Sequence, residues 1–166
     1  ISESEYLDVL KRKTAYLFSA SCEIGAILGA ANEAQQTALR EYGLNLGTAF
    51  HLIDDLLDFI SDEQTLGKAA GADLLGGKVT LPLIYLLEKD PQAAAMVRKV
   101  LVQGSYESVS QLDLLAAINR VGALDLAREK AHAYAGRARA ALDELPESQY
   151  CEALRAIPAY VIERDR

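Results

Sequence analysis

The sequence predicts an all-α protein in which antiparallel helices form a bundle. Of its 166 residues, 51% are hydrophobic and 25% are charged, a balance typical of a globular chain with a buried core. Only 4 residues are proline, and apolar residues recur at three- and four-residue steps along most of the chain, which is the α-helical period. Neither a repeat nor a change of composition interrupts this pattern, so we expect one helical domain over residues 1–166.

A first helix is expected from Ser2 to about Ala30. Ser2 and Glu5 have the spacing of a capping box, in which each side chain bonds the backbone N–H of the other residue. Lys13 lies beside the expected inward face, and periodicity alone favours a surface lysine there. The apolar or small residues expected on the inward face are Leu7, Leu10, Thr14, Leu17, Ser21, Ile24 and Leu28.

A second, longer helix is expected from Glu33 to Ile60. Asn32 and Gln35 repeat the capping-box spacing at its start. Gly43 and Gly47 lie inside this helix, although a helical glycine costs about 1 kcal/mol relative to alanine. We therefore expect these two positions to serve either close helix packing or open space for a ligand.

Residues 50–58, with the sequence FHLIDDLLD, place three carboxylates in an otherwise apolar stretch. At about 100° per residue, Asp54, Asp58 and Asp55 fall at roughly 0°, 40° and 100° around the helix, with His51 near 60°. A helix that is apolar on most sides is buried, and a buried carboxylate without a partner costs about 3–5 kcal/mol. A solvated acidic face is the alternative, but the apolar flanks favour magnesium, which prefers oxygen ligands.

Residues 61–78 show little periodicity and combine glycines with Lys68 and Lys78. A long irregular segment in a helical protein is usually functional or mobile. Glycines let backbone N–H groups approach a ligand, and lysine places a point charge on phosphate. A flexible surface loop is the alternative. Residues 61–78 directly follow the three acids, and this position favours a site that holds a polyanion between a metal and the lysines.

Capping residues, prolines and glycines bound the helices expected in the rest of the chain. Thr80 precedes the first of them, Asp90 separates it from the second, and Gly122 ends the third. Pro146 ends the fourth, and Pro158 lies inside the last. The expected ranges are 80–87, 90–103, 110–121, 124–145 and 147–164.

Charge and cysteine content exclude several classes of protein. The net charge of −7 and the pI near 4.9 argue against a nucleic-acid-binding surface. Cys22 and Cys151 form no spacing motif, so we expect reduced thiols and a cytoplasmic protein. No apolar run is long enough for a transmembrane helix, and no signal peptide is recognisable. The chain starts at Ile1 without a methionine, which suggests a fragment.

Five motifs resemble those of the trans-isoprenyl diphosphate synthases, most nearly the bacterial long-chain, octaprenyl-type members. They occur in the order and spacing of that family, and the resemblance covers essentially the whole chain. It implies the C-terminal part of the isoprenoid synthase fold. The motifs are Lys13-Thr14-Ala15, the run from Gly47 to Asp58, Gly67-Lys68, Gly71-Ala72-Asp73-Leu74, and the run from Gly77 to Ile84.

The resemblance implies head-to-tail prenyl transfer, in which an allylic diphosphate and isopentenyl diphosphate give a longer trans-polyprenyl diphosphate. The second aspartate-rich motif of the family falls on Asp54, Asp55 and Asp58, which would bind Mg²⁺. Asp54, Asp55 and Lys68 would be catalytic. The residues implied to hold the substrate diphosphate are Lys13, Thr14, His51, Lys68 and Lys78.

Two departures from the family pattern affect this interpretation. His51 stands where the family usually has glutamine, and an imidazole titrates near pH 6.5, so binding could depend on pH. The first aspartate-rich motif of the family is absent and should lie well before Ile1. We therefore expect half of an active site, a chain that is inactive alone, and a homodimer in the full-length form.

Two other interpretations remain open. The chain could be a non-catalytic partner subunit of a heteromeric prenyl diphosphate synthase, although such a subunit has no physical need for acids in a buried helix. A helical fold like that of the terpene cyclases could use the same metal chemistry. The combination of aspartates, lysine-bearing loop and Thr80-Leu81-Pro82 favours the synthase over both.

Overall fold

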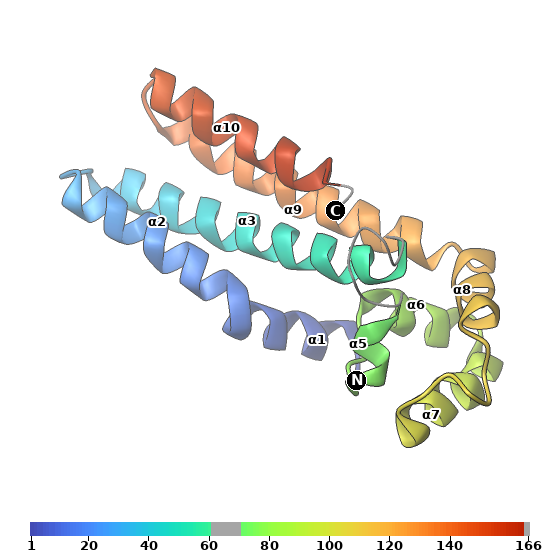
Figure 1. Ribbon diagram of the computed structural model, residues 1–166. Coiled ribbons are helices and arrows are strands. Elements are labelled where there is room, and N and C mark those ends of the chain that lie inside the picture. The colour runs from blue at the N-terminus through green and yellow to red at the C-terminus, as the bar shows by residue number, and fades with distance from the viewer. Residues whose placement is uncertain (61–70, 165–166) are drawn as a thin grey trace. The chain divides into compact units, whose positions relative to one another are not determined.

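The computed structural model describes residues 1–60 and 71–164, and within them every regular element is a helix (Figure 1). The all-α prediction is confirmed. The described residues form two compact units: unit 1 contains Ile1–Tyr6 and Asp54–Glu129, and unit 2 contains Leu7–Ile53 and Lys130–Arg164. The two units are described separately, and the expectation of one domain over residues 1–166 stays a prediction.

The observed helices follow the expected order, and the long helix has the predicted bounds. Residues 61–70 lie outside the described residues, and the remainder of the segment expected to be irregular contains the short helix α5. The helices are α1 (Glu3–Leu10), the π-helix η1 (Lys11–Ala15), α2 (Tyr16–Leu28), α3 (Glu33–Ile60), α5 (Ala72–Leu75), α6 (Leu81–Lys89), the 3₁₀-helix η2 (Pro91–Ala93), α7 (Ala94–Gln103), α8 (Gln111–Arg120), α9 (Ala123–Ala141), the 3₁₀-helix η3 (Leu142–Glu144) and α10 (Gln149–Ile162).

Both predicted capping boxes are present. The backbone N–H of Ser2 donates to Glu5 Oε2 at 2.7 Å, and the N–H of Glu5 donates to Ser2 Oγ at 3.3 Å. The N–H of Asn32 donates to Gln35 Oε1 at 3.1 Å, and the N–H of Gln35 donates to Asn32 Oδ1 at 3.0 Å. These bonds satisfy N–H groups that have no partner inside the helix, so they fix where α1 and α3 begin.

The predicted inward face of the first helix is wrong beyond Leu10. Leu17, Ile24 and Leu28 are 71%, 56% and 82% exposed. The π-helix η1 explains the error, because its wider turn takes one residue more than an α-helical turn and shifts the buried face. The residues that are buried along this run are Leu10, Ala15, Ser19 and Ala26.

Deleting Arg12 from the π-helix is expected to leave the protein folded. Leu10 and Ala15 would then be four positions apart, so a regular α-helix would still bury both. The deletion also removes an exposed ion pair between Arg12 and Asp8, and we expect the free energy of unfolding to change by less than about 1 kcal/mol. Urea denaturation measures this change.

Deleting Ala20 from α2 provides the matched control. The helix around Ala20 is a regular α-helix, without the extra residue of a π-turn. Removal of Ala20 therefore rotates one half of the helix by about 100° relative to the other. Buried and exposed faces then exchange, and we expect a loss of several kcal/mol, on the order of 2–5. Equal losses for the two deletions would contradict the register argument.

The two glycines of α3 bring this helix into close contact with the preceding helical run in unit 2. A Cβ atom at Gly43 would lie 2.5 Å from the carbonyl oxygen of Phe18 and 2.8 Å from the Cα of Ser19. A Cβ atom at Gly47 would lie 2.9 Å from the Cα of Ala15 and 2.9 Å from the Cβ of Phe18. Of the two roles expected for these glycines, the structure supports close helix packing.

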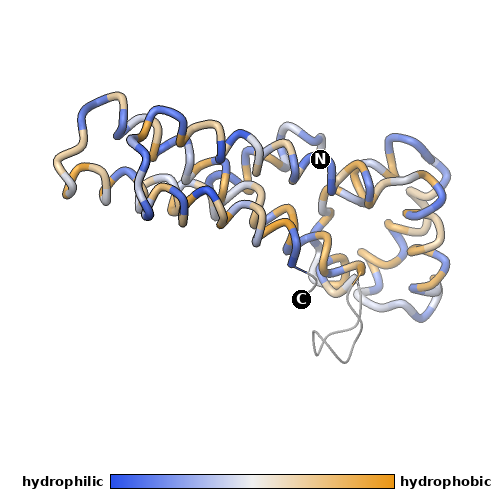
Figure 2. The backbone as a smooth tube through the Cα atoms, turned by 90° about the horizontal axis from the view of Figure 1, so that it is seen from above, coloured by the Kyte–Doolittle hydropathy of each residue, from blue (hydrophilic) through white to orange (hydrophobic). Residues whose placement is uncertain are grey.

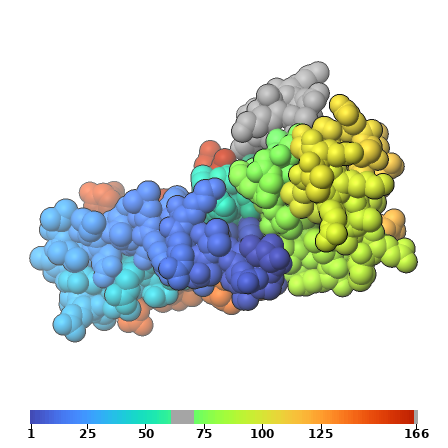
Figure 3. Space-filling view, turned by 90° about the horizontal axis from the view of Figure 1, so that it is seen from below, coloured from blue at the N-terminus to red at the C-terminus, as the bar shows by residue number. Residues whose placement is uncertain are grey.

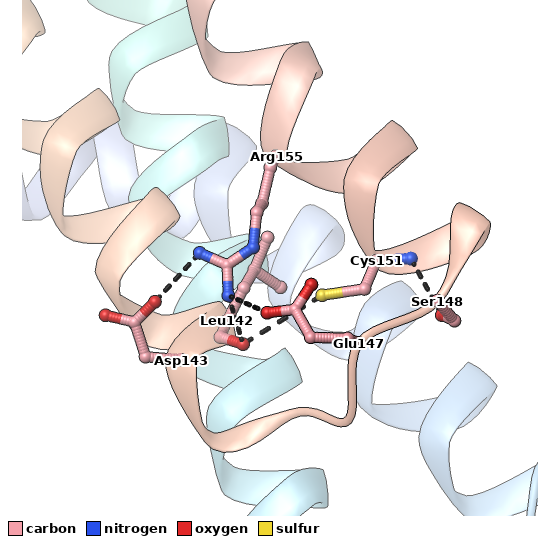
Figure 4. A network of polar contacts seen from close by, with 6 residues as sticks. All are labelled: Leu142, Asp143, Glu147, Ser148, Cys151 and Arg155. Atoms are coloured by element: carbon pink, nitrogen blue, oxygen red, sulfur yellow. Dashed lines mark hydrogen bonds and ion pairs between the residues drawn. The ribbon is translucent and has the colours of Figure 1, made fainter.

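A polar network holds the corner between α9 and α10 in unit 2 (Figure 4). The guanidinium of Arg155 donates to Asp143 Oδ1 at 2.8 Å and to the carbonyl oxygen of Leu142 at 3.2 Å. Ser148 caps α10, because its Oγ accepts from the N–H of Cys151 at 3.1 Å. The two cysteines form no disulfide, in agreement with the sequence prediction.

Unit 1 is built around the apolar helix α6, which Thr80 precedes in extended conformation. Asp90 ends α6 and accepts from the N–H of Gln92 at 3.1 Å, so it caps the next helical turn as predicted. Its carboxylate also accepts from Arg120 at 2.6 Å, which joins the end of α8 to the end of α6. Gly122 follows α8 with a φ of 68°, a left-handed conformation that favours glycine.

Candidate functional site

The last turns of α3 carry the three aspartates into unit 1. Asp55 is buried with 6% of its surface exposed, whereas Asp54 and Asp58 are partly exposed. Leu56 and Leu57, between the acids, are buried in the apolar core of the unit. The predicted arrangement of acids on an otherwise apolar helix is therefore present, with one acid inside and two at the surface.

The backbone at the start of α5 orients Asp58. The N–H of Asp73 lies 3.2 Å and 3.4 Å from the two carboxylate oxygens of Asp58, and the N–H of Gly71 donates to its carbonyl oxygen at 2.7 Å. Burial raises the pKa of the Asp58 carboxyl, and the charges of Asp73 and Asp55 raise it further. Hydrogen bonds from the backbone N–H groups of Asp73 and Ala72 lower the pKa of Asp58 and so act in the opposite direction.

Gly71 makes the turn into α5 possible. Its φ is 75°, and a Cβ atom at this position would lie 2.2 Å from the hydroxyl oxygen of Tyr106. That hydroxyl donates to the carbonyl oxygen of Gly71 at 2.8 Å. Burial and the charge of Asp58 raise the pKa of Tyr106 to about 12, so the phenol remains a donor at neutral pH. The backbone of Gly71 is therefore held beside Asp58.

Lys78 lies on the acidic side of unit 1. Its Nζ is 2.6 Å from Asp73 Oδ1, and its side chain is 56% exposed. The hydrogen bond to Asp73 raises the pKa of Lys78, with smaller contributions from the charges of Asp55 and Asp58. The lysine is thus a cation within the field of the acids, at the surface where a charged ligand could reach it.

Tyr6 is a member of this cluster that sequence reasoning missed. Its hydroxyl donates to Asp55 Oδ2, and the tyrosine is buried. Burial and the charge of Asp55 raise the pKa of the Tyr6 phenol, so it is protonated. No local signal in the sequence identifies Tyr6, because its partner Asp55 lies 49 positions later in the chain.

Unit 2 brings together two other predicted site residues. Thr14 Oγ1 lies 3.1 Å from His51 Nδ1, which joins the π-helix η1 to α3. Lys13, next to Thr14, is exposed. The ring of Phe50, adjacent to His51, packs against the ring of Phe18, with the two ring centroids 5.6 Å apart and the ring planes tilted by 36°. The prediction that Thr14 and His51 share a site is consistent with this contact, whereas Lys68 lies outside the described residues.

Hydrophobic and hydrophilic residues alternate along the backbone (Figure 2). Among the described residues, no helix has the length and apolar character required of a membrane span.

A family model named Polyprenyl synthetase matches residues 1–118. The chain belongs to this family. Octaprenyl diphosphate synthase of Escherichia coli (strain K12) is 40% identical to it over 167 residues, which is 100% of this chain and 51% of that protein. Heptaprenyl diphosphate synthase component 2 of Bacillus subtilis is 37% identical over 160 residues, covering 96% of this chain and 45% of that protein. The chain thus spans about half the length of the curated relatives it matches.

Solved structures of polyprenyl synthases share the fold of the whole chain. A decaprenyl diphosphate synthase from Rhodobacter capsulatus superimposes with a TM-score of 0.90 at 36% identity and covers 100% of this chain and 51% of its own. A polyprenyl synthase from Caulobacter crescentus, complexed with calcium and isoprenyl diphosphate, gives a TM-score of 0.89 at 36% identity with the same coverage. The predicted resemblance to the prenyl synthases is confirmed.

The acidic cluster of this polyprenyl synthetase family member fits a hard divalent cation. Its partly exposed ligands are carboxylate oxygens, and the raised pKa of Asp58 reflects like charges and burial that a cation would offset. Within residues 1–60 and 71–164, no three His, Cys, Asp or Glu side chains converge into a complete metal site. Magnesium is often held by one or two carboxylates, with water or phosphate as its other ligands.

Proposed function

We propose that this chain supplies the diphosphate half-site of a trans-polyprenyl diphosphate synthase, a prenyltransferase that joins an allylic diphosphate to isopentenyl diphosphate. The observation that carries the proposal is the cluster of Asp55, Asp58, Asp73 and Lys78 in unit 1, within a chain of the polyprenyl synthetase family. The pairing of acids with a surface lysine suits a ligand that combines a divalent cation with diphosphate.

The residues of the chain divide the work of binding. Asp54, Asp55 and Asp58 form the acidic side, which would hold Mg²⁺. That ion, when bound, would supply neutralising charge for the departing diphosphate. When diphosphate binds, Lys78 would leave its ion pair with Asp73 and pair with the diphosphate oxygens instead. The family resemblance implies that Lys13, Thr14, His51 and Lys68 also bind substrate diphosphate, and Lys68 lies outside the described residues.

Hydrogen bonds within the chain hold several of the proposed binding side chains in place before the substrate arrives. Their electrostatic stabilisation of the leaving group therefore requires little reorganisation. The hydrogen bond between Thr14 and His51 orients both side chains in unit 2. The N–H of Asp73 orients the Asp58 carboxylate in unit 1. We propose that residues outside this chain supply the remaining half of the site, that the chain alone is inactive, and that the full-length protein is a cytoplasmic homodimer.

A second candidate is a partner subunit of a heteromeric synthase. One relative, 37% identical, carries the name component 2 of a heptaprenyl diphosphate synthase. The clustered acids favour the catalytic role, because several carboxylates held close together are costly to keep ionised without a cation.

Titration of pyrophosphate into the protein by calorimetry tests the proposed function. We expect binding in magnesium, its loss on addition of EDTA, and a drop of about tenfold in affinity for Lys78→Met, since a hydrogen-bonded ion contact contributes on the order of 1.5–3 kcal/mol. Lys89→Met is the control, because Lys89 bonds the carbonyl oxygen of Val121 in the same unit. Binding that EDTA does not affect would refute the metal-dependent half-site.

A further inference from the structure

Asp55 differs from its two neighbours in both burial and partner. It is 6% exposed and accepts a hydrogen bond from the hydroxyl of Tyr6, which is itself 7% exposed. Asp54 and Asp58 are partly exposed, and Asp58 accepts from the backbone N–H of Asp73. The three acids of one motif therefore occupy two environments, one enclosed by protein and one partly exposed.

Helical geometry separates the same residues. Asp54 and Asp58 lie about 40° apart around α3, whereas Asp55 is turned by about 100° from Asp54. One divalent ion at the surface can therefore meet Asp54 and Asp58 together. Asp55 already directs an oxygen to the Tyr6 hydroxyl in the interior of unit 1.

The helix that carries Tyr6 is tied to the unit at a second point. The hydroxyl of Tyr85, on α6, donates to Glu3 Oε2 at 3.0 Å, one helical turn before Tyr6. The hydroxyl of Tyr6 therefore donates to Asp55 from a helix that is held at two points.

We propose that Tyr6 is a positioning residue and that Asp55, one of the three acids assigned above to Mg²⁺, is its anchor rather than a metal ligand. Their hydrogen bond sets the rotation of the acid-bearing end of α3 and so presents Asp54 and Asp58 to magnesium and diphosphate. The inference rests on the function proposed above. It is consistent with the preference of magnesium for one or two protein carboxylates, and with the general role of groups behind a metal site in orienting its ligands.

Substitutions that keep or remove the acceptor at position 55 test the assignment. The measurement is magnesium affinity in the presence of pyrophosphate, made by calorimetry on the full-length protein at a temperature where circular dichroism shows every variant folded. Tyr6→Phe is expected to weaken magnesium binding by about tenfold, the typical cost of removing a group that orients a ligand. Asp55→Ala should weaken magnesium binding to the same extent as Tyr6→Phe.

Asp55→Asn should retain most of the affinity, because the amide oxygen still accepts from Tyr6. The double variant Tyr6→Phe/Asp55→Ala should be no weaker than either single variant, since both changes remove the same bond. Tyr42→Phe is the matched control: it removes a phenol hydroxyl bonded to the carbonyl oxygen of Leu154 in unit 2 and should leave magnesium affinity unchanged. A purely structural role for Tyr6 would lower the melting temperature without this pattern.

Asp54→Asn provides the reference for loss of a direct ligand. If Asp55→Asn loses as much affinity as Asp54→Asn, Asp55 is a ligand and the proposal is overturned. Unchanged affinity in Tyr6→Phe overturns it as well. Wild-type protein that binds no pyrophosphate with magnesium overturns the proposed function itself, so the two failures are distinguishable.

Discussion

Replacing Asp54 by alanine in the full-length protein is expected to lower the turnover of chain elongation by about a thousandfold, near the upper range for loss of one preorganised electrostatic group. Asp54 is partly exposed on the acid-bearing end of α3, and its carboxylate is one of the two that our interpretation places directly on magnesium. Removal of an oxygen ligand weakens the hold on both the cation and the departing diphosphate. The loss should appear in kcat as well as in kcat/KM, because the charge on the leaving group develops in the transition state.

Radiolabelled isopentenyl diphosphate measures this turnover, and a melting curve shows whether the variant is folded. Asp125→Ala is the control, because Asp125 lies on α9 with its side chain 80% exposed and pairs with Arg128. We expect that variant to keep wild-type turnover. If Asp54→Ala also keeps it, the acidic cluster of unit 1 does not act in catalysis.

Replacing Gly43 by alanine is expected to lower the free energy of unfolding by about 3 kcal/mol, the upper end of the usual cost of inserting a methyl group into a packed contact. The new Cβ would lie 2.5 Å from a backbone oxygen of Phe18, and backbone cannot move away as a flexible side chain can. Alanine is the better helix former by about 1 kcal/mol, so the observed loss is net of that gain.

Gly136→Ala isolates the steric contribution. Gly136 lies in α9, and a Cβ atom there would have no atom within 4 Å, so this variant should gain up to about 1 kcal/mol from helix propensity alone. Urea denaturation of both variants gives the comparison. Equal changes at the two positions would show that α3 does not need a glycine at its contact with Phe18.

The elements that could be predicted from the sequence are those specified by local signals. Capping boxes at Ser2 and Asn32, Asp90 before Pro91, and Gly122 after α8 each act through one or two nearby backbone groups. The acids of α3 were also recognisable, because their apolar flanks are local in sequence. These signals fix where helices start and end without knowledge of the tertiary structure.

The features that escaped prediction depend on contacts between distant residues. The π-helix η1 changes which side of α2 is buried, and five residues of basic and small character give no periodic sign of it. The bond between Tyr6 and Asp55 joins positions far apart in the chain. The distinct environments of Asp55 and Asp58 likewise arise from Tyr6 and Asp73, so three aspartates that look alike in the sequence differ in the fold.

The exposed face of α2 affects the self-association of the polypeptide and its dependence on salt. Leu17, Ile24 and Leu28 are exposed apolar side chains of α2, and the space-filling view in Figure 3 shows this N-terminal part of the chain at the surface. In dilute buffer the net charge of −7 keeps molecules apart by mutual repulsion. Salt screens that repulsion over about 10 Å at 0.1 M, and sulfate strengthens the association of apolar surfaces. High-salt conditions therefore favour self-association of the isolated polypeptide through α2, whereas low ionic strength favours separate molecules.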